Sequence, residues 1–207
     1  MTRGKFITVE GVEGGGKSTN IAYIAEQLKK LNIDFILTRE PGGTEVAEAI
    51  RHVLLNTELP SMHEDTELLL MFAARAEHIQ TKILPALESG KWVICDRFTD
   101  SSYAYQSGGR GIPAKKIATL ETWVQGNLRP DATLLFDLDA DVGLARTRIR
   151  GAADRFEKED IDFFNAVRKQ YLHMAKDYPE RYRIVDAQQD LAGVQQQLDT
   201  ILDELLK

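Results

Sequence analysis

The amino-acid sequence predicts an α/β fold in which helices cover both faces of a five-stranded parallel sheet. Two observations carry this prediction: five short apolar runs alternate with helical patterns, and a phosphate-binding motif follows the first run. Strands that alternate with helices are joined by right-handed crossovers and run parallel, with ligands at their carboxyl ends. The expected strands are Phe6–Glu10, Phe35–Thr38, Trp92–Asp96, Leu134–Asp137 and Tyr182–Asp186.

Apolar side chains at helical spacing predict the helices between and after these strands. The expected helical segments are 21–31, one long helix over 68–87, 117–124, 163–174 and 194–205. The sequence has no internal repeat, low-complexity linker or domain boundary, so we expect residues 1–207 to form a single domain. The charged segment 150–160 interrupts the periodicity, and we expect a short mobile lid at about 148–160.

Composition and charge argue against several classes of function. The net charge is 26 − 32 = −6, which disfavours broad binding to nucleic acid or to anionic membranes. No apolar segment approaches the length of a membrane span, and the N-terminus lacks a signal peptide's apolar region. Because Cys95 is the one cysteine, no disulfide can form within the chain, which suits the cytoplasm. We therefore expect a cytoplasmic protein with no nucleic-acid or membrane partner.

The segment 11–18 (GVEGGGKS) fits the phosphate-binding pattern of Gly, four residues, then Gly-Lys-Ser/Thr. It joins an expected strand to an expected helix, where backbone N–H groups and the helix dipole favour an anion. Lys17 would reach the β- and γ-phosphates of a nucleoside triphosphate, and Ser18 would hold Mg²⁺. The alternative is a glycine-rich turn without a ligand. The motif predicts the triphosphate but does not identify the group that receives the phosphate.

Charged residues at the ends of two other strands point to the same edge of the sheet. Asp96 follows the third strand, where an acid near a phosphate loop organises Mg²⁺, and Arg97 beside it would bind a phosphate. The alternative for this pair is a strand-end ion pair. Arg39 ends the second strand next to a Pro-Gly-Gly turn that leads into a helix, and such turns need no ligand.

Three further features have both a structural and a ligand-binding interpretation. Arg75 lies in an otherwise apolar helix near Phe72, where it would either extend toward solvent or hold a planar base. The segment 101–106 (SSYAYQ) is either a capped helix start or part of a nucleoside pocket. The basic residues of the expected lid would form a solvated face or close on transferring phosphates; they are Arg148, Arg150 and Arg155.

Taken together, these segments resemble the thymidylate kinase family of P-loop nucleoside monophosphate kinases over nearly the whole chain. The resemblance rests on FITVEGVEGGGKST at the start, TREPGGT at 38–44, LLLMFAAR at 68–75, DRFTDSSYAYQ at 96–106, RPD at 129–131 and DRFE at 154–157. It implies a P-loop NTPase-type sheet with a lid. It also implies Mg²⁺-dependent transfer of the γ-phosphate of ATP to dTMP, for dTTP synthesis, by a cytoplasmic homodimer.

The resemblance also implies a role for each site residue. ATP would be held by Lys17 and the loop amides. Mg²⁺ would be held by Ser18 and Asp96, and the acceptor phosphate would be bound by Arg39 and Arg97. The implied catalytic residues are Lys17, Arg97, Arg150 and Arg155. The implied ATP-binding residues are Gly11, Val12, Glu13, Gly14, Gly15, Gly16, Lys17, Ser18 and Thr19. The implied dTMP-binding residues are Glu13, Arg39, Phe72, Arg75, Arg97, Ser102, Tyr105 and Gln106.

Within the family, this chain is similar to the bacterial subgroup whose lid supplies the catalytic arginine, because its phosphate loop contains none. Many members carry phenylalanine four residues before the base-binding arginine, whereas here Met71 holds that position and Phe72 follows it. Either Phe72 stacks on thymine or Met71 packs there. Other nucleotide kinases remain the alternative enzymes, and a GTP-dependent switch lacks its Asn-Lys-x-Asp motif.

Overall fold

The computed structural model describes residues 3–148, 155, 156 and 158–206, and within these residues five parallel strands form one sheet. The strand order is β2-β3-β1-β4-β5, which confirms the predicted fold class. β2 and β4 are one and two residues longer than expected. The strands are β1 (Phe6–Glu10), β2 (Phe35–Arg39), β3 (Trp92–Asp96), β4 (Ala132–Asp137) and β5 (Tyr182–Asp186).

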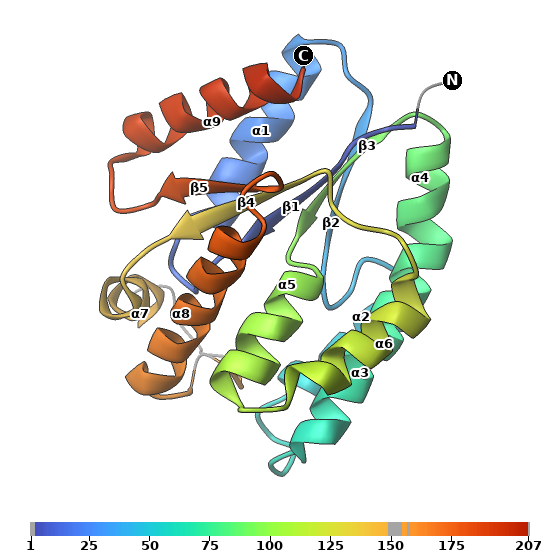
Figure 1. The fold of residues 1–207 in the computed structure, drawn as a ribbon, viewed down its shortest axis with the longest axis vertical. Coiled ribbons are helices and arrows are strands. Elements are labelled where there is room, and N and C mark those ends of the chain that lie inside the picture. The colour runs from blue at the N-terminus through green and yellow to red at the C-terminus, as the bar shows by residue number, and fades with distance from the viewer. Residues whose placement is uncertain (1–2, 149–154, 157, 207) are drawn as a thin grey trace.

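Helical segments connect the strands and cover both faces of the sheet. They are α1 (Lys17–Lys30), α2 (Glu45–Leu55), α3 (Glu64–His78), η1 (Ile79–Ile83), α4 (Leu84–Glu88), α5 (Thr99–Ser102), η2 (Tyr103–Gly109), α6 (Ala114–Gln125), α7 (Ala140–Arg148), α8 (Ile161–Asp177) and α9 (Leu191–Leu205). α1 and α9 contact each other over one face, while α4 and α8 pack on the strands from the other face (Figure 1). This division follows from right-handed crossovers running in opposite directions from β1 and β3.

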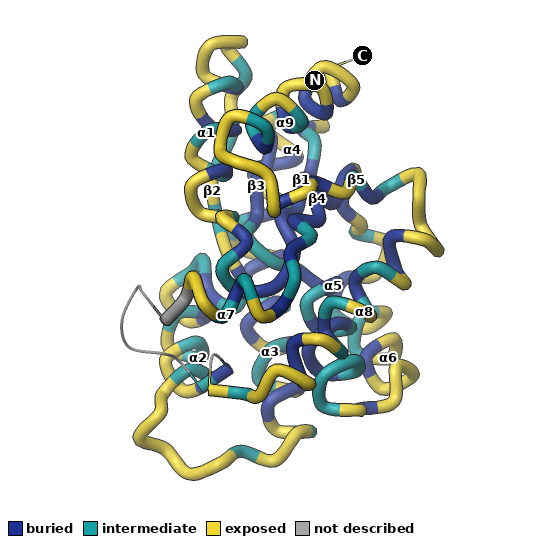
Figure 2. Tube along the Cα trace, turned by 90° about the vertical axis from the view of Figure 1, so that its left-hand side faces the viewer, coloured by how far each residue is buried: buried dark blue, intermediate teal, exposed yellow. Residues whose placement is uncertain are grey.

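The core lies at the three central strands. All five residues of β1 are buried, and β3 and β4 are buried except at their last residue, whereas the edge strand β2 alternates between half-buried and exposed residues. Figure 2 shows this gradient, with buried central strands and exposed helix faces at the periphery. Continuous apolar runs are required where a parallel strand is covered on both sides. The polar ends of the buried strands therefore mark where the sheet opens toward a site.

The prediction of one uninterrupted helix over 68–87 was wrong in detail. The chain stays helical, but the five-residue π-helical segment η1 separates α3 from α4. Pro85 provides the physical reason, because it lacks a backbone N–H and its ring crowds the preceding turn. A widened turn before the proline relieves that crowding.

The expected lid is described only in part. Residues 149–154 and 157, which include the predicted Arg150, lie outside the described residues, and α8 begins at Ile161. Cys95 is buried with a free thiol. Among the described helices, none is both long enough and apolar enough to cross a membrane.

Candidate functional site

A cavity of about 260 Å³ lies at the carboxyl ends of β1, β2 and β3. Its position follows from the register, which pairs Val9 with Asp96 and Arg39 with Asp96 at the ends of adjacent strands. The cavity brings together most of the predicted acceptor and metal residues. The predicted residues that line it are Glu13, Ser18, Arg39, Arg75, Asp96, Arg97, Ser102, Tyr105 and Gln106.

The phosphate-binding loop has the geometry that the motif requires. Gly11 has φ +132°, and a Cβ there would lie 2.4 Å from the carbonyl oxygen of Phe136, so only glycine lets the loop pack on β4. α1 begins at Lys17, and no described side chain caps its first turn. The amides at this helix start are therefore available to an anion.

The Lys17 ammonium folds back onto its own loop. Its Nζ donates to the carbonyl oxygens of Gly11 at 3.1 Å and Val12 at 2.8 Å. Burial, together with the positive charge of Arg97, lowers the pKa of Lys17 to about 8. A bound phosphate offers a stronger acceptor than these carbonyls, so the ammonium can exchange one set of partners for the other.

Arg97 is the centre of the charged part of the cavity. Its backbone has φ +68°, an uncommon conformation for a residue with a Cβ, and its side chain lines the cavity. Its Nη2 donates to Glu13 at 2.6 Å and to the Tyr105 hydroxyl at 2.9 Å. Although burial opposes the shift, the charges of Arg97 and Lys17 hold the pKa of Glu13 below its usual range.

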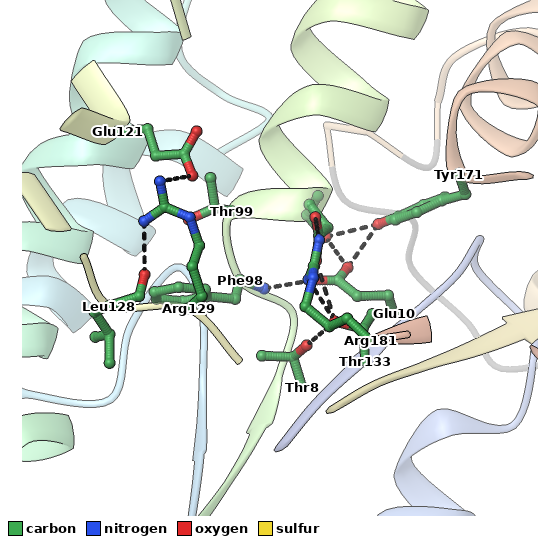
Figure 3. A network of polar contacts seen from close by, with 12 residues as sticks. Thr8, Glu10, Phe98, Thr99, Glu121, Leu128, Arg129, Thr133, Tyr171 and Arg181 are labelled. Carbon is green, nitrogen blue, oxygen red and sulfur yellow. Dashed lines mark hydrogen bonds and ion pairs between the residues drawn. The ribbon is translucent and has the colours of Figure 1, made fainter. Parts of the chain in front are cut away.

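Behind Arg97 lies a buried carboxylate that sequence analysis did not identify. Glu10 accepts from the backbone N–H of Phe98 and from the Tyr171 hydroxyl, both at 2.7 Å, and from the Ser101 hydroxyl at 2.6 Å (Figure 3). Ser101 therefore does not cap α5. Burial and the neighbouring Asp100 raise the pKa of Glu10 to about 7.

Asp96 and Ser18 are the residues predicted to hold Mg²⁺, and the structure allows their fit to this ion to be examined. Both line the cavity, and Asp96 Oδ1 is buried with no hydrogen-bond partner in the described part of the chain. A buried carboxylate oxygen without a donor is suited to a cation. Since Mg²⁺ is held by one or two protein oxygens together with waters and substrate phosphates, these two residues fit it.

Arg75 is buried at the closed end of the cavity rather than extended to solvent. Its Nε donates to Glu40 at 2.7 Å, and its Nη2 donates to the Ser102 hydroxyl at 3.1 Å and the Phe98 carbonyl at 3.2 Å. Its Nη1 is buried without a partner among the residues described. Since Arg75 lines the cavity, Nη1 is a hydrogen-bond donor there to which the described part of the protein offers no acceptor.

The structure places Phe72 and Met71 differently. Phe72 is buried beneath Arg75, with the guanidinium carbon 4.5 Å from the ring centroid, and it is not among the residues that line the cavity. Met71 does line it. Phe72 therefore supports the arginine from below, and the flexible thioether faces the space where a base would lie.

Gln106 extends into the cavity from η2 and is anchored by a second carboxylate that sequence analysis missed. Its Nε2 donates to Glu67 at 2.9 Å, and Glu67 also accepts from Arg110 at 3.4 Å and from Arg155. The signal in the sequence was an acid within the apolar stretch that leads to Arg75. A buried acid requires partners, but these lie 39 to 88 residues away along the chain.

The two remaining predicted cations that the structure describes, Arg39 and Arg155, are paired with carboxylates. Arg39 lines the cavity but forms an exposed ion pair with Glu48 at 2.9 Å. Such a pair contributes ~0–1 kcal/mol, so Arg39 can turn to a phosphate at little cost. Arg155 contacts Glu67, and the neighbouring Phe156 lines the cavity.

Comparisons with known proteins agree with this geometry. A family model described as "Thymidylate kinase" matches residues 9–198. A thymidylate kinase from Pseudomonas fluorescens (strain Pf-5) is 59% identical over 204 residues, covering 99% of this chain and 97% of the relative. One from Ruthia magnifica is 53% identical over 205 residues, covering 99% of this chain and 100% of the relative.

A solved structure also matches over nearly the full length. The crystal structure of thymidylate kinase from Ehrlichia chaffeensis superposes with a TM-score of 0.77 at 32% identity, covering 97% of this chain and 99% of that one. The family match includes the phosphate loop, β2, β3 and the carboxyl end of β1. The chain belongs to the thymidylate kinase family.

Proposed function

We propose that this chain transfers the γ-phosphate of ATP to dTMP, giving ADP and dTDP for dTTP and DNA synthesis. The observation that carries the proposal is the cavity beside the phosphate loop, whose two ends differ in chemistry. Its closed end presents Arg75 and Gln106, which can hydrogen-bond a pyrimidine edge, and its open end presents Arg97 next to the loop. A nucleoside monophosphate fits this order of base, sugar and phosphate.

For the acceptor, Arg75 Nη1 would donate to the O4 carbonyl of thymine, and Met71 would pack on the base. Ser102 and Gln106 would border the base edge, while Tyr105 would lie beneath the sugar and disfavour a 2′-hydroxyl. The acid of Glu13 would face the 3′-hydroxyl. Because a carbonyl satisfies the otherwise unpartnered donor of Arg75, thymine binding removes a desolvation cost of the empty cavity.

For the donor, backbone amides of Gly11–Thr19 and the Lys17 ammonium would hold the phosphates of ATP. Ser18 and Asp96 would hold Mg²⁺, which neutralises phosphate charge when bound. A single nearby carboxylate suffices. Among the described residues, no group of three or more His, Cys, Asp or Glu is placed to hold a metal ion by itself. The magnesium requirement would be tested by removing the ion with a chelator, which should abolish turnover and be reversed by adding Mg²⁺.

Phosphoryl transfer requires two anionic ligands to approach each other in line, so catalysis is mainly positioning and charge neutralisation. Arg97 and Arg39 would bind the acceptor phosphate, and Lys17 would bind the donor phosphates. The lid arginines Arg150 and Arg155 remain the candidates for the transferring group, and closure of the lid would exclude water. Comparing Arg150→Ala with Arg155→Ala by turnover number would identify which one acts.

We further propose that the chain is one P-loop kinase domain that functions as a cytoplasmic homodimer. The support for a dimer is apolar surface on two helices that pack together: Leu69 on α3 is 56% exposed and Trp123 on α6 is 82% exposed. Exposed apolar side chains of this size on adjacent helices are typical of an interface. Sedimentation should give a dimer that Leu69→Glu weakens, and a stable monomer would contradict the proposal.

The activity itself is tested by coupling ADP release to a spectrophotometric readout across nucleoside monophosphates. We expect dTMP to give the highest kcat/KM with ATP and Mg²⁺. Equal or better turnover of GMP, UMP or AMP would contradict the assignment of dTMP. Slow ATP hydrolysis that no monophosphate accelerates would contradict the transferase activity altogether.

A further inference from the structure

Glu67 is a buried acid on α3 that none of the assignments above uses. Its residue exposure is 1%, and it lies behind Gln106, on the protein side of the side chain that faces the base. A carboxylate at such a position is costly unless donors surround it. The hydrogen-bond partners of Glu67 must therefore explain why an acid occupies this buried position.

Within the described part of the chain, the side chains that bind the Glu67 carboxylate are all hydrogen-bond donors. Arg110 donates through Nε and Nη2 at 3.5 and 3.4 Å, and Arg155 donates through Nη2. Guanidinium groups have no acceptor, so Glu67 can only accept from them. The third donor is Gln106 Nε2 at 2.9 Å, and a carboxylate held in this way can receive only the NH₂ end of that amide.

This contact determines which end of the Gln106 amide faces the cavity. The NH₂ group is directed to Glu67, so the carbonyl oxygen Oε1 is the group left to the ligand side. No residue in the described ranges donates to Oε1. The closed end of the cavity thus presents a donor, Arg75 Nη1, that is buried without a partner among the described residues. Beside it lies Gln106, whose NH₂ group is held by Glu67 and whose Oε1 is therefore the amide atom available to a ligand.

That pair is complementary to thymine and opposed to cytosine. Thymine presents the acceptor O4 next to the donor N3–H, whereas cytosine presents an amino donor next to the acceptor N3. We infer that Glu67 is a positioning residue that sets base specificity, because it holds the Gln106 carbonyl toward N3 and so excludes cytosine. This inference rests on the proposed use of dTMP as acceptor.

The decisive variant is Glu67→Gln, tested with dTMP and dCMP in the wild-type and variant proteins. A glutamine at 67 can donate to Gln106 Oε1, which lets the Gln106 amide turn and present its NH₂ to N3. We expect the ratio of kcat/KM for dTMP over dCMP to fall by ~10-fold or more, with the absolute value for dCMP rising. Wild-type protein and the variant share the mismatch between Arg75 and the cytosine amino group, so this mismatch cancels when their kcat/KM ratios are compared.

A purely structural role for Glu67 gives a different result. Loss of packing would lower kcat/KM for both nucleotides together and leave their ratio unchanged, and that outcome would overturn the inference. The matched control is Glu159→Gln, because Glu159 also pairs with Arg110, at 2.6 Å, but does not contact Gln106. It should leave the ratio at its wild-type value.

A second variant keeps the inference testable if Glu67→Gln does not fold. Glu67→Gln with Gln106→Glu exchanges the two side chains, so the carboxylate at 106 accepts from position 67 and still presents an acceptor to N3–H. We expect this double variant to recover the preference for dTMP, and a preference for dCMP would contradict the account. Wild-type protein that fails to use dTMP would refute the proposed function instead, independently of Glu67.

Discussion

The two ends of the cavity are organised in opposite ways. At the base end, the two side chains proposed to bind the thymine edge are already held by carboxylates: Arg75 by Glu40 at 2.7 Å, and Gln106 by Glu67 at 2.9 Å. At the donor end, Lys17 bonds to carbonyls of its own loop and Ser18 is exposed. The acceptor subsite is thus organised before ligand arrives, while the donor loop must exchange internal bonds for phosphate.

This difference indicates that the base end provides selectivity between bases, while the donor end neutralises phosphate charge. Buried, paired groups cannot readily adapt, so they discriminate between bases by leaving a mismatched partner unsatisfied. Exposed or self-bonded cations adapt at low cost and respond to any phosphate, to pH and to salt. Arg97 joins the two regions, because it contacts Glu13 of the phosphate loop and Tyr105 of the acceptor wall.

The largest effect is expected where the two regions meet. Arg97→Ala should lower kcat by ~10²-fold or more, because it removes the preorganised charge that would bind the acceptor phosphate. The measurement is steady-state turnover at saturating ATP and dTMP. Arg3→Ala serves as the control, since Arg3 forms an exposed pair with Asp131 far from the cavity, and it should leave kcat unchanged. Near-normal turnover of Arg97→Ala would remove that residue from the site.

The next effect isolates the base end. Glu40→Gln should raise KM for dTMP by ~10-fold and leave KM for ATP unchanged, because Arg75 loses the charged acceptor that orients it. The matched control is Glu48→Gln at the exposed Arg39 pair, for which we expect less than about threefold on KM for dTMP. Equal changes in both Michaelis constants would show that the two ends are not organised separately.

A pH profile examines the donor end. The free protein's Lys17 has a pKa of about 8, so it loses its positive charge, and its attraction for phosphate, as the pH rises above that value. We expect kcat/KM for ATP to fall ~10-fold per pH unit above about pH 8, while kcat changes less because bound phosphates stabilise the ammonium. A flat profile to pH 10 would contradict this picture of the loop.

The smallest effect is expected for Glu10, the buried carboxylate behind Arg97. The folded-state pKa of Glu10, about 7, exceeds its ordinary value of 4.5, so the folded protein binds this proton more tightly than the unfolded chain does. Its contribution to stability is complete below pH 4.5 and is lost as the pH rises through 7. Relative to Glu10→Gln, wild-type protein should lose on the order of 1–3 kcal/mol of unfolding free energy between pH 5.5 and 8.5 in urea titrations. Parallel curves would contradict the raised pKa.

The strands of the sheet could be predicted from the sequence because local residue patterns mark them, whereas their order came from the structure. Apolar runs define the buried strands to within two residues, and the spacing of glycines and Lys17 defines the phosphate loop. Helices α2 and α7 were not delimited: α2 was expected only as a helix of unstated length after the turn at 41–43, and α7 was not expected. α7 ends at Arg148, where the lid was expected to begin. The π-helical segments η1 and η2 span only five and seven residues, which is too short for apolar spacing to distinguish their period from that of an α-helix.

The site, too, could be predicted from the sequence only in part. Residues that touch a ligand lie at strand ends or in recognisable segments, so Asp96, Arg97 and Arg75 could be identified. Their supporting acids could not, because Glu40 and Glu67 acquire their partners only through tertiary contacts 35 or more residues away. The choice between Met71 and Phe72 likewise required the rotation of α3 relative to the cavity, which adjacent positions in a helix do not reveal.

The central claim is that the acceptor subsite is organised for thymine before the ligand binds, and a crystal structure with dTMP alone tests it most directly. The account predicts thymine O4 within about 3.2 Å of Arg75 Nη1 and N3 within the same distance of the Gln106 amide, with Glu40 and Glu67 keeping their present contacts. The phosphate should lie on Arg97, and Lys17 should remain on its loop carbonyls. A base bound outside this cavity, or Arg75 and Gln106 released from their carboxylates, would contradict it.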